Sequence, residues 1–431
     1  MESTDTGRSV YGDHAAGSTT VAELLSDQAF FAAMVEVEAC LTESAIAAGT
    51  VGASTGAAVA AVIRAVQPDV VALSEAAVAG GNPAIPLVKV LKRAVVAAGH
   101  PVTAVHVGAT SQDIIDTALL WCVHRAVAAM SGTLGTLTDV LADLAVRERE
   151  TPVIGRTLGQ QAVPTTFGLT AAGWLRQLDA AADEVDRAVG LLPVQYAGAA
   201  GNLAAAGPAG PAIHRELARR TGLQAQPVVW HTDRTPVARL AASLALVGGA
   251  VRKIAGDVVL LSATEVGELR EAAPGGSSAM PHKANPAAAV AAAGYARRTT
   301  GYTVTLLEAM DGELQRAAGA WHAEWQTLRD LVVVTDNAVT RLAASLTGIT
   351  VDRAAMARNL ALTDGAVLAE ALAQVVGRAR VDEAVAAGRL GELMADAQRE
   401  QGFSPDPADH TGQATALVDA LVAEHKGEEH G

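Results

Sequence analysis

Apolar residues recur along much of the chain at spacings of three and four, the period of an α-helix that buries one side. The clearest run has apolar residues at Leu240, Leu244, Val247, Val251, Ile254, Val258 and Leu261. This heptad-like seam predicts one long helix that packs against similar helices in a bundle. Residues 136–150 and 166–191 have mostly Asp, Glu and Arg at their polar positions and predict two further long helices.

Breaks that contain glycine and proline separate the helical stretches, and they lie at residues 80–86, 207–211, 274–286 and 403–412. We therefore predict an all-α chain with three helical domains. These are an N-terminal helical domain over 21–105, a central long-helix bundle with the catalytic loops over 106–347, and a small C-terminal helical domain over 348–431. The first 20 residues are polar and rich in Gly and Ser, and we expect them to be disordered.

The composition supports helices and narrows the possible partners. Half of the 431 residues are apolar but only 3% are aromatic, which suits closely packed helices better than an aromatic-rich sheet. The net charge is −14 and the Lys and Arg residues are scattered, which argues against a nucleic acid or an anionic membrane as partner. The polar first 20 residues lead us to expect no secretion signal, and we find no uninterrupted apolar run of about 20 residues. With two cysteines in apolar surroundings, Cys40 and Cys122, we expect a cytoplasmic protein.

The segment over 274–286 is the strongest candidate for chemistry. Its glycines, serines and prolines cannot continue a helix, so it is predicted to be a loop between helices. Two hydroxyls, Ser277 and Ser278, follow a mobile Gly-Gly pair and precede Lys283 and Asn285. A hydroxyl becomes a base only where cations and amide donors stabilise its alkoxide, and a loop that closes could supply both.

Two other segments carry clustered polar side chains. Thr110, Ser111 and Gln112 stand just before a helix predicted to begin near Gln112, where exposed amides and hydroxyls suit a carboxylate. Helix capping alone would explain one hydroxyl of this set. The stretch over 156–168 is predicted to be a polar turn that enters the next helix, and its Gln160 could bind substrate or satisfy buried backbone. No His, Asp and Glu grouping has metal-ligand spacing, so we expect neither a metal nor another cofactor.

These segments together resemble the fumarase/aspartase superfamily. The run Gly-Ser-Ser-Ala-Met-Pro-His-Lys-Ala-Asn-Pro over 276–286 resembles its signature loop, and Gly-Ala-Thr-Ser-Gln-Asp over 108–113 resembles its substrate loop. Within the superfamily the chain is most similar to the bacterial 3-carboxy-cis,cis-muconate cycloisomerases. The supporting stretches include 82–88, 156–162, 195–201, 230–234 and 317–325.

The resemblance implies a three-domain all-α fold, a homotetramer whose active sites are shared by different subunits, and a small polycarboxylate substrate. It places the catalytic base at Ser277 and groups that hold the substrate carboxylate at Lys283 and Asn285. Substrate-binding positions fall on Thr110, Ser111, Gln112, Asn82, His106, Gln160, Arg234, Arg329, Ser278 and Met280.

The chain departs from the family pattern at three places. Ala284 replaces the arginine of the usual Lys-Arg-Asn, and Asn202 replaces a threonine after Gly-Ala-Ala-Gly. The histidine that acts as acid in the adenylosuccinate lyase branch is absent from 156–162, where Leu158 and Gln161 stand. The general acid therefore remains open, and so does the exact substrate.

Three functions follow from these observations. The first is a cycloisomerase in which Ser277 transfers a proton at the carbon next to a carboxylate, through an aci-carboxylate that Lys283 and Asn285 stabilise. The second is a lyase that eliminates an amine, nitrite or a similar group from a succinate derivative and releases fumarate. The third is a scaffold that has lost catalysis, like the lens crystallins of this superfamily, and the retained Ser277, Lys283 and Asn285 argue against it.

Overall fold

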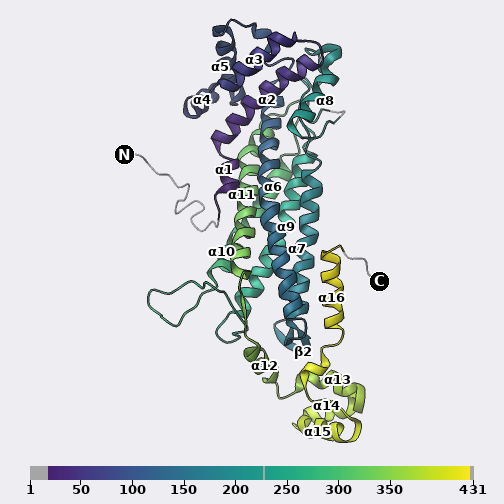
Figure 1. Cartoon of the computed structure of the whole chain (residues 1–431). Coiled ribbons are helices and arrows are strands. Elements are labelled where there is room, and N and C mark those ends of the chain that lie inside the picture. Colours follow the sequence, from purple (N-terminus) through teal and green to yellow (C-terminus); the bar gives the residue numbers. More distant parts are fainter. Residues whose placement is uncertain (1–17, 227–228, 428–431) are drawn as a thin grey trace. The chain divides into compact units, whose positions relative to one another are not determined.

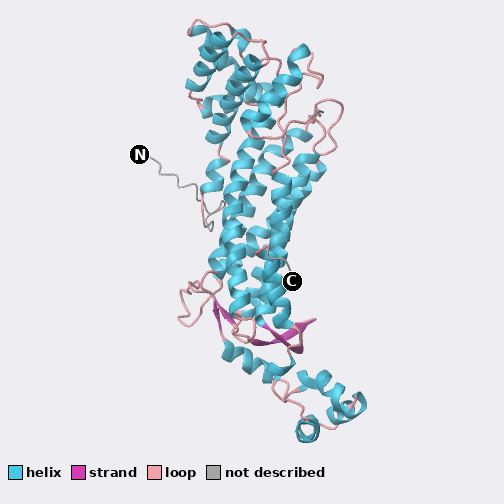
Figure 2. Cartoon of the chain, turned by 45° about the vertical axis from the view of Figure 1, so that its right-hand side comes forward, coloured by secondary structure: helices cyan, strands magenta, loops and turns pink. Residues whose placement is uncertain are grey.

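The computed structural model describes residues 18–226 and 229–427, and it confirms the all-α prediction (Figures 1 and 2). Helices dominate these residues, and their β-structure consists of two antiparallel two-stranded sheets and two isolated bridges. The predicted disordered segment, 1–20, lies outside the described residues except for its last three, and α1 begins at Thr20.

The long helices are α6 (Ser111–Arg147), α7 (Phe167–Val189), α9 (Thr235–Leu261), α10 (Ala287–Glu308) and α11 (Ala320–Leu346). The shorter ones are α1 (Thr20–Leu24), α2 (Asp27–Ala47), α3 (Ala53–Ala65), α4 (Val70–Ala77), α5 (Ala84–Ala97), α8 (Gly210–Thr221), α12 (Arg353–Ala361), α13 (Ala369–Val376), α14 (Arg378–Ala386), α15 (Leu390–Gln401) and α16 (Ala414–His425). The strands are β1 (Pro152–Thr157), β2 (Gln160–Thr166), β3 (Leu269–Arg270) and β4 (Thr350–Val351). The 3-10 helices are η1 (Val78–Gly80), η2 (Val102–Ala104), η3 (Gly207–Ala209), η4 (Ala366–Leu368) and η5 (Pro407–His410).

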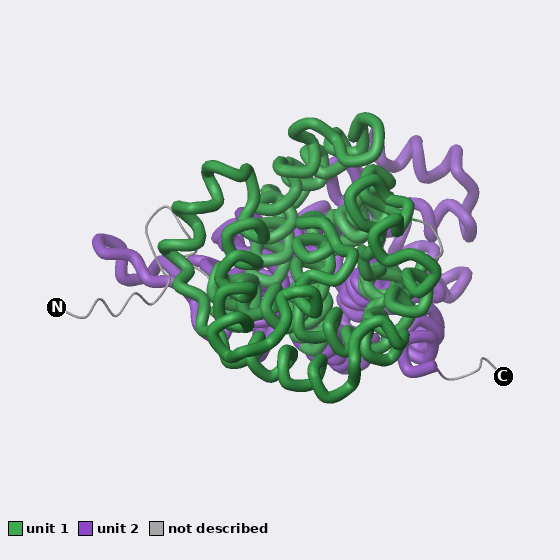
Figure 3. Tube along the Cα trace, turned by 90° about the horizontal axis from the view of Figure 1, so that it is seen from above, with its two compact units in different colours: residues 1–132, 182–248, 295–337 green, residues 133–181, 249–294, 338–431 purple. Residues whose placement is uncertain are grey.

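The chain forms two compact units (Figure 3). Unit 1 comprises residues 1–132, 182–248 and 295–337, and unit 2 comprises residues 133–181, 249–294 and 338–431. Each unit is therefore assembled from three stretches of chain that are distant in the sequence. The predicted division into three domains stays a prediction.

The apolar seam predicted from the sequence is the buried side of α9. Six of its seven residues are fully buried, and only the last, Leu261, is partly exposed. The long helices predicted over 136–150 and 166–191 are confirmed as the end of α6 and as α7. Their alternation of apolar and charged positions made these helices visible in the sequence.

Helix α6 is long and apolar enough to cross a membrane, and so are two bent helix pairs among the described residues if each pair is counted as one span. Within α6, however, 67% of the apolar window is buried inside the protein. The helix also buries the side chains of Asp113, Asp116 and Thr117. Its hydropathy is therefore that of a core helix with polar groups at one end.

Unit 2 contains the β-hairpin that β1 and β2 form, where the sequence predicted only a polar turn. The turn residues Leu158 and Gly159 both have positive φ, 52° and 77°, as a tight two-residue hairpin requires. The β-branched residues of the two strands favour extended backbone over the helical period. One end of the hairpin reaches a small core, where Ile154 packs with Leu360 and Leu372.

The start of α7 lies very close to the end of α6 in unit 2. The amide of Gly168 donates to the carbonyl of Glu148 at 2.9 Å. A Cβ atom on Gly168 would lie 2.4 Å from the Cα of Arg149 and 2.6 Å from the carbonyl oxygen of Ala145. Both neighbours are backbone, so a side chain could be accommodated only if the two helix ends moved apart.

We predict that Gly168→Ala lowers the stability of the folded chain by about 1–3 kcal/mol, because it overpacks two backbones. The matched control is Gly173→Ala in the same helix, where a Cβ meets no atom within 4 Å. That change should be neutral or stabilising by up to about 1 kcal/mol, because alanine favours the helix. Thermal unfolding followed by circular dichroism measures both variants, and equal melting temperatures would refute the close contact.

Candidate active site

The predicted site residues fall into two groups, each within one compact unit. The loop over 274–286 belongs to unit 2, and Thr110, Ser111 and Gln112 belong to unit 1. Figure 1 shows the loop as a long excursion of the chain before α10.

A buried glutamate fixes the end of the loop. The carboxylate of Glu271 accepts hydrogen bonds from the amides of Ala288 (3.2 Å) and Ala289 (2.8 Å), in the first turn of α10. It satisfies amides that have no partner within the helix, and its negative charge faces the positive end of the helix dipole. Gly275 and Asn285 then close the loop, because the amide of each donates to the carbonyl of the other at 2.8 and 2.9 Å.

Ser277 lies within this closed loop, partly exposed. Its Oγ accepts hydrogen bonds from the amides of Met280 (3.2 Å) and Ala279 (3.4 Å). Amide donors that point at a hydroxyl oxygen stabilise negative charge on it. The side chains of Lys283 and Ser278 are exposed, as is Met280 at 43%. The loop thus presents a hydroxyl with anion-stabilising donors, and a cation in the same loop, to the solvent.

The other group is organised by an arginine that sequence reasoning missed. In unit 1, Arg316 donates from Nη1 to Thr110 Oγ1 (2.6 Å), from Nη2 to Ser111 Oγ (3.2 Å) and from Nε to Gln112 Oε1 (3.2 Å). Its partners are therefore neutral oxygens, and no carboxylate of the described residues forms an ion pair with it. Because the two hydroxyl oxygens accept from Arg316, their protons are available to donate to a further anion.

The backbone on both sides of this group is strained. Leu314 and Ala317, which flank Arg316, have φ of 53° and 58°, a region that L-residues rarely adopt. Such conformations persist where surrounding contacts enforce them, and they gather at functional sites. No periodic or motif signal in the sequence distinguished Arg316, because its three partners lie about 200 residues away.

The carboxylate of Asp113 holds Thr110–Gln112 in place. It accepts from the amides of Thr110 (2.9 Å), Ala197 (3.1 Å) and Gly198 (2.9 Å), and from Nε2 of His231 (2.8 Å). It therefore caps α6 and ties the segment after α7 to the same point. His231 is buried, and its Nδ1 has no partner among the described residues.

Arg234 lies in a buried ion-pair network of unit 1. Its guanidinium bonds both oxygens of Asp116 (3.0 and 3.2 Å) and pairs with Glu324 at 2.6 Å. Burial acts to lower the pKa of Arg234, but the two carboxylates outweigh it and raise the pKa above its usual range. For Glu324, burial prevails over the arginine and raises the pKa. Every nitrogen of this guanidinium already has a protein partner, so the arrangement suits support of the site rather than direct contact.

His106 has a partner across unit 1. Its Nδ1 lies 2.6 Å from Oε1 of Glu38, and its φ of 59° holds the ring at the loop before α6. Burial acts to lower the pKa of His106, but the charge and hydrogen bond of Glu38 raise it overall. The fully buried Glu38 therefore favours the protonated form of the imidazole beside it.

The other predicted residues lie outside these two groups. The side chain of Asn82 bonds the backbone of Gly80 (3.3 Å) and Ile85 (3.3 Å). Arg329 bonds the carbonyl of Leu25 at 3.2 Å and lines a unit 1 cavity of about 630 Å³. Gln160 is exposed at the start of β2 in unit 2. The structure therefore gathers Thr110–Gln112 around Arg316 in unit 1 and Ser277, Lys283 and Asn285 in unit 2, and it leaves Asn82, Arg329 and Gln160 apart from these contacts.

The stretch over 156–162, which lacks the family's histidine, contributes Arg156 and Gln161 to a polar cluster in unit 2. Arg156 forms a two-bond ion pair with the fully buried Glu268, at 2.5 and 2.9 Å, and Asn359 donates to Glu268 at 2.6 Å. Gln161 donates to the carbonyl of Asn359 at 2.8 Å. These groups connect the hairpin to α12. Within the described part of the chain, no three His, Cys, Asp or Glu side chains are grouped so that they could hold a metal ion.

Comparison with known proteins shows the family to which the chain belongs. Residues 15–301 match a protein family described as lyase. The chain is 39% identical to a 3-carboxy-cis,cis-muconate cycloisomerase of Pseudomonas aeruginosa, with 93% of each chain covered. It is 40% identical to a nitrosuccinate lyase of Streptomyces davaonensis, with 94% of this chain and 92% of that protein covered.

Solved structures agree with the sequence relatives. The 3-carboxy-cis,cis-muconate lactonizing enzyme from Pseudomonas putida is similar with a TM-score of 0.88 at 36% identity, covering 96% of this chain and 98% of that one. A fumarate lyase from Mesorhizobium sp. BNC1 is similar with a TM-score of 0.85 at 31% identity, covering 96% of this chain and 100% of that one. The chain therefore belongs to the lyase family of the fumarase/aspartase superfamily, as an enzyme like the bacterial 3-carboxy-cis,cis-muconate cycloisomerases.

Proposed function

We propose that the enzyme interconverts 3-carboxy-cis,cis-muconate and its lactone by proton transfer at a carbon next to a carboxylate. The observation that carries this proposal is Arg316, a cation that meets only neutral oxygens at the start of α6. A site of this kind suits a substrate carboxylate, which would accept from Arg316 and from the hydroxyls of Thr110 and Ser111. The relatives named cycloisomerase support the choice of substrate.

Ser277 is the proposed proton carrier. A carbon acid beside a carboxylate is very weak, because loss of its proton makes a doubly charged aci-carboxylate. Groups that stabilise the developing charge are worth about 3–4 kcal/mol each. In this proposal Ser277 Oγ takes the proton, the amides of Ala279 and Met280 favour its anionic form beforehand, and Lys283 and Asn285 stabilise the dianion.

The same proton transfer serves both directions. When the lactone opens, Ser277 removes the α-proton, the electron pair forms the carbon–carbon double bond, and the ring C–O bond breaks to release a carboxylate. When the lactone closes, that carboxylate adds to the double bond and the proton returns to carbon. The leaving group is part of the substrate, so no other molecule is required.

The nitrosuccinate lyase relative favours a second function, elimination from a succinate derivative to give fumarate. Here the same α-proton leaves, but the bond that breaks joins carbon to a separate group such as nitrite. Ala284 and Asn202 depart from the family pattern, and loss of the loop arginine at 284 suits a changed leaving group.

We also propose a homotetramer in the cytoplasm, with active sites to which different subunits contribute. The membership in the lyase family supports this assembly, because a homotetramer with shared active sites is what the resemblance to the superfamily implies. Two free, buried cysteines support a reducing compartment. Burial raises the pKa of Cys122 to about 11, so it stays a thiol.

The purified enzyme should consume 3-carboxy-cis,cis-muconate faster than it releases fumarate from nitrosuccinate at equal concentrations. Ultraviolet absorbance follows both reactions, since the conjugated diene is lost in one and fumarate forms in the other. Faster release of fumarate would replace the first function by the second. Turnover of neither substrate would contradict both.

Ser277→Ala should reduce kcat by about 10²–10⁴, the usual contribution of a positioned acid or base. Ser278→Ala keeps the neighbouring hydroxyl and should raise KM more than it lowers kcat. Steady-state rates of the two variants distinguish these roles, with circular dichroism to verify folding. A larger loss of kcat in Ser278→Ala than in Ser277→Ala would contradict the assignment of proton transfer to Ser277.

Arg316→Gln should lower kcat/KM about 100-fold, because a carboxylate loses its cationic partner. The matched control is Arg219→Gln, which removes the same charge from an exposed arginine whose partner is Glu216. It should leave kcat/KM within about twofold, as surface ion pairs contribute little. Equal rates for Arg316→Gln and the wild type would remove Arg316 from substrate binding.

A further inference from the structure

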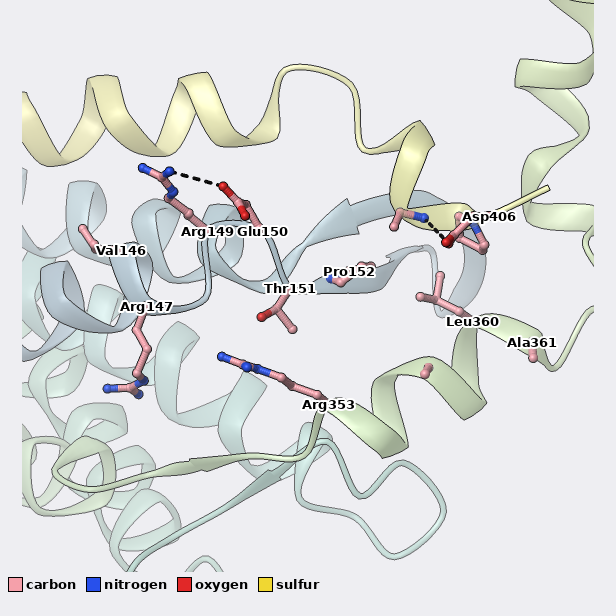
Figure 4. A pocket seen from close by; sticks show the side chains of 13 residues that line it. Val146, Arg147, Arg149, Glu150, Thr151, Pro152, Arg353, Leu360, Ala361 and Asp406 are labelled. Atoms are coloured by element: carbon pink, nitrogen blue, oxygen red, sulfur yellow. Dashed lines mark hydrogen bonds and ion pairs between the residues drawn. The ribbon is translucent and has the colours of Figure 1, made fainter. Parts of the chain in front are cut away.

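Unit 2 contains a cavity of about 670 Å³ that no residue of the 274–286 loop lines (Figure 4). The end of α6, the start of β1, α12 and η5 form its walls. In Figure 4 the side chains of Arg147 and Arg149 lie toward one end of the cavity, with Leu360 and Ala361 toward the other. Arg353 extends from the first residue of α12 into the space between them.

One buried carboxylate positions two of these arginines. Glu148 accepts from Nε of Arg353 at 3.0 Å, from Nε of Arg147 at 3.3 Å and from the hydroxyl of Thr151 at 2.6 Å. Burial acts to raise the pKa of Glu148, but these hydrogen bonds and the charge of Arg353 lower it overall, so the group stays ionised. Both guanidinium groups are therefore held by their Nε atoms.

The outer nitrogens of both groups remain available. Among the described residues, neither Arg147 nor Arg353 has a partner for its Nη atoms, and their side chains are 53% and 63% exposed. Arg149 differs, because its Nη atoms pair with Glu150 at 3.2 Å and with Asp419 at 3.4 Å. The cavity thus has two open guanidinium forks, the geometry that binds a planar oxyanion through two hydrogen bonds.

The charged groups and the apolar residues of the cavity indicate which class of ligand it could bind. The cavity has three arginines, Arg147, Arg149 and Arg353, and the carboxylates of Glu148, Glu150 and Asp406 lie beside them, so these six groups carry no net charge. These carboxylates repel a doubly charged phosphate about twice as strongly as a monoanion at the same distance, which favours a monoanion between the two open forks. The other end of the cavity, which includes Leu360, is apolar and would bury a hydrocarbon body.

We propose that this cavity binds a small monocarboxylate with a flat apolar body, at a site separate from the proposed active site. The carboxylate lies between the forks of Arg147 and Arg353, and the apolar body lies against Leu360 and the adjoining proline and alanine side chains. The site does not depend on the proposed function, because it shares no residue with the catalytic groups.

Isothermal titration calorimetry of the full chain with benzoate tests the site. Benzoate should bind, whereas benzyl alcohol, which has the body without the charge, and inorganic phosphate, which has charge without the body, should bind at least about tenfold more weakly. No heat with benzoate, or tighter binding of phosphate, would overturn the proposal.

Variants locate the binding site. Arg147→Gln and Arg353→Gln should each raise the Kd for benzoate about tenfold, the loss expected for one charge-assisted hydrogen-bonded contact. Arg149→Gln removes the same charge from an arginine whose Nη atoms are already paired, and should change the Kd by less than about threefold.

Arg353→Lys keeps the positive charge but removes the planar guanidinium. It therefore tests whether binding needs the guanidinium geometry or only the charge, and it remains informative if Arg353→Gln does not fold. Its Kd should also rise, since lysine cannot form two parallel hydrogen bonds. Equal weakening by Arg147→Gln and Arg149→Gln, or an unchanged Kd in Arg353→Lys, would show that net charge alone attracts benzoate and would overturn the site.

Discussion

The carboxylate of Asp113 is the contact on which the position of Thr110, Ser111 and Gln112 in unit 1 depends. One buried side chain accepts from the amide of Thr110, just before α6, from the amide of Ala197 and from His231. A buried carboxylate is stable only when such donors surround it, so these segments must meet at this point. Because these segments meet at Asp113, they fix where α6 begins and the direction in which Thr110, Ser111 and Gln112 face.

A second group of buried charges surrounds Asp116, three residues after Asp113 in α6. Arg234 lies between Asp116 and Glu324, and Trp321 and Gln195 donate further hydrogen bonds to Asp116. Buried ion pairs of this kind add little net stability over apolar packing, but loss of one partner leaves an uncompensated buried charge, so the three groups depend on one another. Thr232, two residues before Arg234, also donates to the carbonyl of Leu314 at 3.1 Å, and this contact holds the loop in which Leu314 and Ala317 have positive φ.

The loop of unit 2 is arranged by a different principle. Glu271 fixes the start of α10, and the paired backbones of Gly275 and Asn285 close the base of the loop. The residues between them are largely exposed, and few contacts restrain them. Local opening of such a segment costs little free energy, as a loop that closes over substrate requires.

The sequence determined the helical class and the chemistry of the loop. Helical periodicity acts over neighbouring residues, so the seam on α9 and the helix start near Gln112 were readable without a structure. The motif over 276–286 likewise places its serines, lysine and asparagine within one short segment. Each of these features depends on residues that are close together in the sequence, so the spacing of those residues is enough to predict it.

Only the tertiary structure decided which distant groups meet. Arg316 lies about 200 residues from its three partners, and no spacing rule links positions so far apart. The same holds for Arg234, which the resemblance placed in contact with substrate and the fold places between two carboxylates. The β-hairpin, too, followed from packing against α12 and its neighbours, because its polar sequence had no strong period of its own. Charge and hydrogen bonding act through space, and the fold alone sets those distances.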